Sequence, residues 1–123
     1  NITSLTAKQP INDLIISSTL RPGILGLAKI LSNQYSKFGI LVNNVCPGHY
    51  LTKRQEEIIK KRSTERNITA EEYIQQHSNE IPIGRFGKPE ELANMIVFLC
   101  SEKASYVTGS TISVDGGLVK GLF

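Results

Sequence analysis

The sequence lacks the features that mark membrane, secreted and disordered proteins. No continuous apolar run approaches the roughly 18 to 20 residues that a helix needs to cross a bilayer, and the longest runs are 40–42 and 95–100. No positively charged segment leads into an apolar one near the start, so no secretory signal is visible. Of the 123 residues, 40% are hydrophobic and 20% charged, which excludes wholesale disorder and is typical of one globular domain.

Cysteine is equally scarce. Cys46 and Cys100 belong to no CxxC pair, and His49 and His77 show no zinc-like spacing. The sequence therefore predicts neither a disulfide framework nor a metal site. Each cysteine stands in an apolar run, and we expect each to be a small buried hydrophobic residue in a reducing cytoplasm.

Strong charge of one sign is also absent. Fourteen Lys and Arg against eleven Asp and Glu give a net charge of +3, too mild to indicate a nucleic-acid partner. The densest basic stretch, 53–66, holds Glu56 and Glu57 four residues before Lys60 and Lys61, a spacing typical of a solvated helix. A phosphate-bearing substrate or cofactor near this stretch is the alternative interpretation.

A long helix is predicted where apolar residues recur at steps of three, four and seven. It ends near Ser36, with Gly39 beyond it as a stop. Pro22 leaves two starts open. A helix that begins at Pro22 uses its fixed φ, whereas one that begins near Leu14 carries Pro22 inside, loses a backbone hydrogen bond and kinks at a cost of roughly 3 kcal/mol. The apolar stripe consists of Leu20, Ile24, Leu27, Ala28, Leu31 and Tyr35.

The rest of the chain alternates strands and helices. Residues 40–46 read as a strand buried on both faces and closed by Pro47 and Gly48, and 111–114 as a last strand. Helices are expected over 53–66, over 70–78 behind the capping box 69–72, and from Pro89 onward. The apolar face of this last helix would be Leu92, Ala93, Ile96, Leu99 and Cys100.

This order predicts an α/β fold with a parallel sheet and flanking helices. Ligands on such sheets bind beyond the carboxyl ends of the strands. That rule directs attention to Ser4, to residues 47–52 and to the segment after Val114.

Three blocks of sequence follow one another at fixed spacing. They are 39–48 (GILVNNVCPG) with Thr52 after it, 81–93 (IPIGRFGKPEELA), and the closing trio 98–101, 106–109 and 114–117 (FLCS, YVTG, VDGG). Together they resemble the short-chain dehydrogenases/reductases, closest to the group like 3-oxoacyl-carrier-protein reductases. The resemblance covers nearly the whole chain.

The resemblance implies a doubly wound Rossmann-type sheet that binds NAD or NADP and a small carbonyl or alcohol substrate. Because the chain begins at Asn1 and holds no Gly-rich dinucleotide loop, we expect residues 1–123 to be the C-terminal half of a single Rossmann-type domain. Residues 49–80 would be its substrate-loop excursion. Without that loop an isolated chain should hold cofactor poorly. Relatives associate through the 20–35 helix and the last strand, so a homo-oligomer, a tetramer by resemblance, is expected.

The catalytic residues depart from the family pattern. Relatives use a Tyr that donates a proton, a Lys four residues later and a Ser thirteen residues before the Tyr. Alignment of residues 26–31 (GLAKIL) with the family helix leaves Ser4 at the Ser position, Ser17 at the Tyr position and Arg21 at the Lys position. The pKa of a phenol, ordinarily near 10, can be lowered toward the working pH by a neighbouring cation, whereas an aliphatic hydroxyl is a much poorer acid. Arg21 keeps charge and donors for a ribose but cannot relay a proton.

Three interpretations stay open. In the first, the protein is an oxidoreductase with another proton donor, Tyr50 in the loop beyond the strand or, second to it, His49. In the second, a slow or altered reaction is catalysed by Ser17, Arg21 and Ser4. In the third, the protein is a catalytically silent homologue that binds a nucleotide or assembles with partners.

Cofactor contacts are also implied by the resemblance. Thr52 would contact the nicotinamide amide or cap the next helix, and both roles are compatible. Pro47 and Gly48 would let the backbone approach the nicotinamide ring or would simply end the strand. Structural roles are expected for Asn43, Asn44, Arg85 and Asp115.

Overall fold

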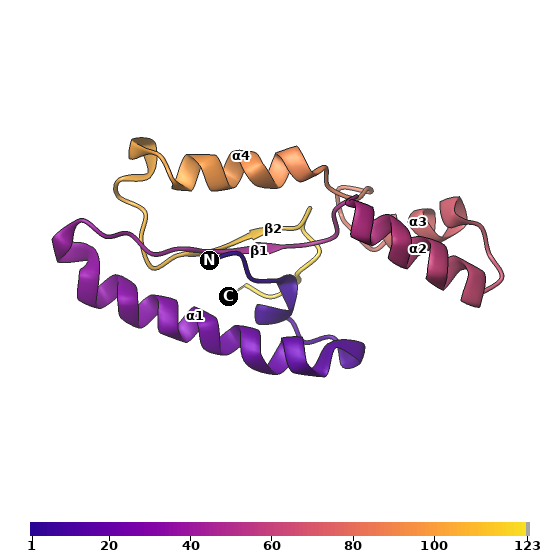
Figure 1. The fold of residues 1–123 in the computed structure, drawn as a ribbon, viewed down its shortest axis with the longest axis horizontal. Helices are drawn as coiled ribbons and strands as arrows, with labels where there is room; N and C mark the ends of the chain where they lie inside the picture. The colour runs from indigo at the N-terminus through magenta and orange to yellow at the C-terminus, as the bar shows by residue number, and fades with distance from the viewer. Residues whose placement is uncertain (123) are drawn as a thin grey trace.

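The computed structural model describes residues 1–122, and in it two long helices cover opposite sides of a small parallel sheet (Figure 1). β1 (Asn44–Pro47) pairs in parallel with β2 (Thr111–Val114). On its other edge, β1 forms a parallel bridge between Val45 and Ile2. β1 is therefore the middle of three parallel segments, and the predicted α/β arrangement is confirmed.

β1 is shorter than the predicted strand over 40–46. The backbone N–H of Val42 donates to the Thr108 hydroxyl at 3.0 Å, and the amide of Asn43 donates to the carbonyl of Val107 at 2.7 Å. Before Asn44 these side-chain bonds accompany a single backbone bond, from the Gly109 N–H to the Val42 carbonyl at 2.8 Å, so the regular ladder begins only at Asn44. The side chain of Asn44 is buried and donates to Thr111 at 3.1 Å, the structural role predicted for it.

α1 (Ile15–Tyr35) contains Pro22, so the longer of the two predicted helices is correct. It follows a short 3₁₀ turn (Asn12–Leu14). Pro22 has no N–H to donate to the carbonyl of Ser18, and the helix continues through this gap. It ends through a second turn at Gly39, whose φ of 77° is favourable for glycine.

The buried side of α1 differs from the predicted stripe. Of the stripe, only Ala28 is fully buried, while Leu20 is 63% and Leu27 55% exposed. Ala28 and Ser32 are buried, and a Cβ at Gly109, in the loop before β2, would lie only 2.6 Å from the Ser32 hydroxyl. Small residues at the contact bring the helix close and leave the large apolar ones outward.

Residues 12–38 are long and apolar enough to cross a membrane by length and composition alone. Their mean hydropathy reaches 1.4 over a stretch of 18 residues. One such helix is weak evidence for a membrane span, and only 6% of this stretch is buried, so its contacts within the described residues do not account for its apolar composition.

α2 (Lys53–Glu65) and α3 (Ala70–Ser78) form an arm beyond the end of the sheet (Figure 1). Thr69 and Glu72 make the predicted capping box at the start of α3. The arm packs on a buried apolar cluster formed by Ile59, Tyr73, Ile81 and Phe86, of which the last two belong to the loop that follows α3.

α4 (Pro89–Leu99) covers the side of the sheet opposite α1 (Figure 1). No residue of this helix is fully buried, although a full apolar face was predicted to pack. Cys46 is buried as expected, but Cys100 is exposed, so that prediction is wrong. The face of α4 lies over only the few strands described here, and its end extends past what they cover.

Candidate functional site

A hydrogen-bonded group joins the start of α1 to the segment that follows Ile2. Ser17 and Arg21 lie four residues apart on α1, and the Arg21 Nε donates to the Ser17 hydroxyl at 2.8 Å. The Arg21 Nη1 donates to the backbone carbonyl of Thr3 at 2.6 Å. The guanidinium is thus held between its own helix and the end of the strand-like segment.

Thr6 completes this group from the other side. Its hydroxyl lies 2.8 Å from the Ser17 hydroxyl, and only 1% of Thr6 is exposed. The Ser4 hydroxyl accepts from the backbone N–H of Thr6 at 3.2 Å and so caps the short 3₁₀ turn (Leu5–Ala7). The structure therefore brings Ser4, Ser17 and Arg21 together through Thr3 and Thr6.

Ser17 and Arg21 line a broad groove with several apolar side chains. The other lining residues are Asp13, Leu14, Ile15, Ile16, Leu20 and Ile24. Within residues 1–122, the Arg21 Nη2 makes no hydrogen bond, so a donor and a positive charge remain directed to this groove. A cation beside a hydroxyl in an apolar groove can polarise a carbonyl or bind a sugar hydroxyl.

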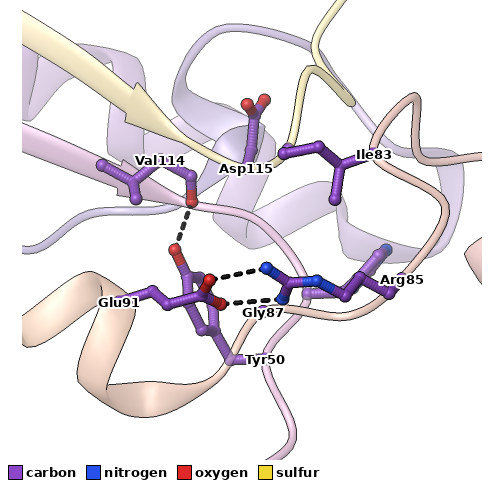
Figure 2. Close-up of a pocket in the computed structure, with 9 residues that line it drawn as sticks. Tyr50, Ile83, Arg85, Gly87, Glu91, Val114 and Asp115 are labelled. Carbon is purple, nitrogen blue, oxygen red and sulfur yellow. Dashed lines mark hydrogen bonds and ion pairs between the residues drawn. The ribbon is translucent and has the colours of Figure 1, made fainter.

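Tyr50 lies in a separate pocket, with different neighbours (Figure 2). Its hydroxyl donates to the carbonyl of Val114 at 2.7 Å. Burial, then the carboxylates of Glu91 and Asp115, raise the pKa of the Tyr50 phenol above its ordinary 10.0. A phenol whose proton is held by a backbone carbonyl and whose acidity is reduced is poorly suited to donate a proton to a substrate.

The ring of Tyr50 also fills the space beside Gly87. A Cβ at Gly87 would lie 2.6 Å from that ring. The geometry favours Tyr50 as a packing residue that joins β2 to the loop before α4. His49, the second predicted donor, stacks on Phe86 with ring centres 5.6 Å apart, and burial lowers the pKa of its imidazole.

Arg85 and Glu91 form a two-point ion pair in this pocket (Figure 2). Their nitrogen–oxygen distances are 2.8 and 2.6 Å. Hydrogen bonds from Arg85 and from the Lys88 backbone lower the pKa of Glu91 to about 2. Asp115 accepts from the N–H groups of Gly117 and Val119 and so holds the C-terminal segment, as expected, whereas Arg85 binds the start of α4 instead.

Pro47, Gly48 and Thr52 are engaged within the chain itself. Pro47 ends β1, and a Cβ on Gly48 would lie 2.7 Å from the Cα of Asp115. Glycine is thus required at position 48 by the two strand ends, whatever ligand approaches. Thr52 caps α2 by accepting from the Gln55 N–H at 3.2 Å. The cofactor contacts expected of these three residues stay predictions.

Comparison with known proteins identifies the family. The family model described as Enoyl-(Acyl carrier protein) reductase matches residues 1–119. A 3-oxoacyl-[acyl-carrier-protein] reductase of Aquifex aeolicus is 41% identical over 101 residues, which are 82% of this chain and 36% of that protein. The chain belongs to the short-chain dehydrogenase/reductase family.

Solved structures of short-chain dehydrogenases/reductases share this fold. L-sorbose reductase from Gluconobacter frateurii, complexed with NADPH and L-sorbose, superposes with a TM-score of 0.92 at 37% identity. It matches 98% of this chain and 46% of its own. A short-chain oxidoreductase from Pseudomonas aeruginosa PAO1, NADPH-bound and described as containing an atypical catalytic center, gives 0.83 at 30% identity, over 98% of this chain and 45% of that one.

The chain thus spans less than half the length of these relatives, and the described part is the Rossmann-type α/β portion that they share. Members of the family are NAD(P)-dependent oxidoreductases, and the cofactor named in both structures is NADPH.

Family motifs predicted which residues to examine at the site, but not all of its members. Thr3 and Thr6 were missed, although each makes a contact that holds Ser17 or Arg21. Their signal was faint: hydroxyl residues at 3, 4 and 6 where a strand ends and a turn begins. The contact between Thr6 and Ser17, eleven positions later, is visible only in the folded structure.

Proposed function

We propose that the complete protein is an NAD(P)-dependent reductase of small carbonyl compounds whose site is built on Ser4, Ser17 and Arg21. The observation that carries this proposal is the hydrogen bond from Arg21 to Ser17 beside the Ser4 turn, at the position of the family's Lys, Tyr and Ser. The Pseudomonas relative, described as both NADPH-bound and atypical in its catalytic center, supports the compatibility of cofactor binding with such a departure.

In this proposal a bound nicotinamide cofactor supplies the hydride. Arg21 would hold a ribose hydroxyl through its Nη2, and Thr52, Pro47 and Gly48 would hold the nicotinamide end. Ser4 and Ser17 donate hydrogen bonds to the carbonyl oxygen, which becomes negative as hydride arrives. Arg21 stays protonated, so it stabilises charge without supplying a proton. Water from the open groove protonates the product oxygen.

The substrate class follows from the relatives. We infer a small 3-oxoacyl thioester or a related ketone, since the Aquifex relative is named for a 3-oxoacyl substrate and the Gluconobacter one for L-sorbose. The basic α2 helix in the 49–80 excursion offers Lys53, Arg54, Lys60 and Lys61 to a phosphate-bearing carrier.

The test is turnover on the complete protein. Acetoacetyl-CoA, L-sorbose and a wide panel of ketones are incubated with NADH or NADPH, and loss of nicotinamide absorbance is followed beside a fluorescence titration of cofactor binding. Hydride transfer to at least one ketone is expected. Cofactor binding with no transfer across the panel would instead support a silent nucleotide-binding or oligomerising homologue, the alternative that replacement of the family Tyr and Lys favours.

We further propose a cytoplasmic homo-oligomer, a tetramer as in relatives. The support is the outward apolar face of α1, where Leu20, Leu27 and Ile30 are 63%, 55% and 55% exposed. Exposed apolar surface of this kind marks an interaction face.

A further inference from the structure

We propose that Thr6 is a positioning residue. Its hydroxyl donates to Ser17, and this donation turns the only remaining proton of Ser17 toward the substrate oxygen. The inference deepens the proposed function and rests on it. Neither the family motifs nor the relatives assign a role to position 6.

The first step is the environment of Thr6. Thr6 is 1% exposed, and its hydroxyl lies 2.8 Å from the Ser17 hydroxyl. Within residues 1–122 that hydroxyl makes no other hydrogen bond, while the backbone N–H of Thr6 is taken by Ser4. The Thr6 proton therefore has a single acceptor available, which is the Ser17 oxygen.

The second step is a count of donors and acceptors around Ser17. A serine hydroxyl carries one proton and two acceptor lone pairs. The Arg21 Nε is always a donor, so its hydrogen bond at 2.8 Å occupies one lone pair. The remaining bond to Thr6 runs in one of two directions.

Burial decides between those directions. If Ser17 donated to Thr6, the Thr6 proton would be buried without an acceptor, which is costly. If Thr6 donates to Ser17, every buried group is satisfied and both lone pairs of Ser17 are filled. The Ser17 proton then has no acceptor within the group, and it points to the groove that Ser17 and Arg21 line.

The consequence is a hydroxyl that acts only as a donor. The guanidinium of Arg21 and the Thr6 hydroxyl both polarise Ser17, and hydrogen bonds in such chains strengthen one another. A donor fixed in advance toward a developing negative oxygen lowers the barrier without reorganisation. Thr6 thus acts through Ser17 and never touches the substrate.

The experiment uses the complete protein and a matched pair of variants. Thr6→Val keeps the shape but removes the donor, and Thr6→Ser keeps the donor. With acetoacetyl-CoA as substrate, we expect Thr6→Val to lower kcat by about tenfold while the KM for cofactor is unchanged. Thr6→Ser should retain most of the rate. In a Ser17→Ala background, Thr6→Val should have no further effect.

Equal rates for Thr6→Val and the unmodified protein, or an equal loss in the Ser17→Ala background, would overturn the inference and leave the reductase proposal intact. Affinity of acetoacetyl-CoA for the NADP⁺-loaded protein gives a readout without turnover. A second outcome is that no hydride is transferred, while Thr6→Val weakens the binding of acetoacetyl-CoA in the unmodified protein but not in the Ser17→Ala background. In that case the reductase proposal fails and the role of Thr6 stands. A protein that neither reduces nor binds the ketone would overturn both.

Discussion

The family resemblance predicts that Ser17 and Arg21 replace the tyrosine and the lysine of relatives. The exchange keeps a positive charge and a hydroxyl in contact, as the 2.8 Å bond from Arg21 to Ser17 shows, but replaces a tunable acid by a weak one. The spacing of the family motif directed attention to Ser4, Ser17 and Arg21, which the structure links by hydrogen bonds through Thr3 and Thr6, and their shared catalytic role stays a prediction. The spacing could not predict Thr6, because its contact depends on how the turn 5–7 meets α1.

Arg21→Met tests the charge at this site. The variant keeps an unbranched apolar stem but loses the charge and the bonds to Ser17 and to the Thr3 carbonyl. In the complete protein we expect kcat/KM for the ketone to fall by about tenfold or more. Lys103→Met, at an exposed position that follows α4, is the control and should retain its rate. Undiminished turnover in Arg21→Met would show that Arg21 has no role in the reaction.

Tyr50→Phe separates packing from proton donation. Loss of the hydrogen bond to Val114 should lower the free energy of unfolding by about 1 kcal/mol in urea titrations and leave turnover unchanged. Tyr106→Phe, at a fully exposed ring, should change neither quantity. Abolished turnover with normal cofactor affinity would restore Tyr50 as the proton donor.

Helices and strands whose ends are set by neighbouring residues in the sequence were predicted well. Features that depend on contacts with residues far away in the sequence were not. The helix over 70–78 and the strand over 111–114 have the predicted bounds, because a capping box and turn residues fix their ends. β1 was predicted too long because hydrogen bonds that involve the side chains of Thr108 and Asn43 interrupt the regular ladder before Asn44. The buried side of α1 was misjudged because small residues, not large ones, meet the sheet.

Gly48→Ala tests the close approach of the two strand ends. The added Cβ would lie 2.7 Å from the backbone of Asp115, so β1 or β2 must shift. We expect a loss of about 1–3 kcal/mol in the free energy of unfolding. Gly26→Ala is the matched control: nothing lies within 4 Å of its Cβ, and alanine favours the helix by up to about 1 kcal/mol. Equal stability for the two variants would contradict this assignment.

Glu91 ties the start of α4 to the loop that carries Arg85, and its contribution depends on pH. Its pKa of about 2 in the folded state is below the ordinary 4.5, so the unfolded chain binds the proton more readily. The stabilisation is complete above about pH 4.5 and is lost as pH falls toward about 2.

Glu91→Gln should therefore flatten this part of the acid-unfolding curve, measured by circular dichroism. Glu90→Gln, at the neighbouring position on the same turn, should leave the curve as it is. A Glu91→Gln protein with the unmodified pH dependence would show that the ion pair adds nothing.

At the scale of the whole molecule, large apolar side chains remain on the surface. α1 and α4 lie on opposite sides of three parallel segments, and the relatives are more than twice as long as this chain. Exposed apolar surface of this size indicates an interaction face, and under the proposed homo-oligomer it would contact another copy of the chain.

Leu27→Glu tests whether this face contacts another copy. If α1 is an interface between copies, the complete protein should sediment at a smaller mass in analytical ultracentrifugation and keep its fold. Val97→Glu on α4, where Val97 is 67% exposed, is the control and should keep the unmodified mass. An unchanged mass with reduced stability would show that the chain's own residues cover this face.

The arm of α2 and α3 has an apolar cluster of its own. Its packing is separate from the Thr6–Ser17–Arg21 group, which rests on α1 and the opening segment. If the proposed reductase is correct, substitutions in the arm should change which substrates are accepted while Ser17 and Arg21 keep their hydrogen bonds. Substrate selection and hydride acceptance would then rest on separate parts of the fold.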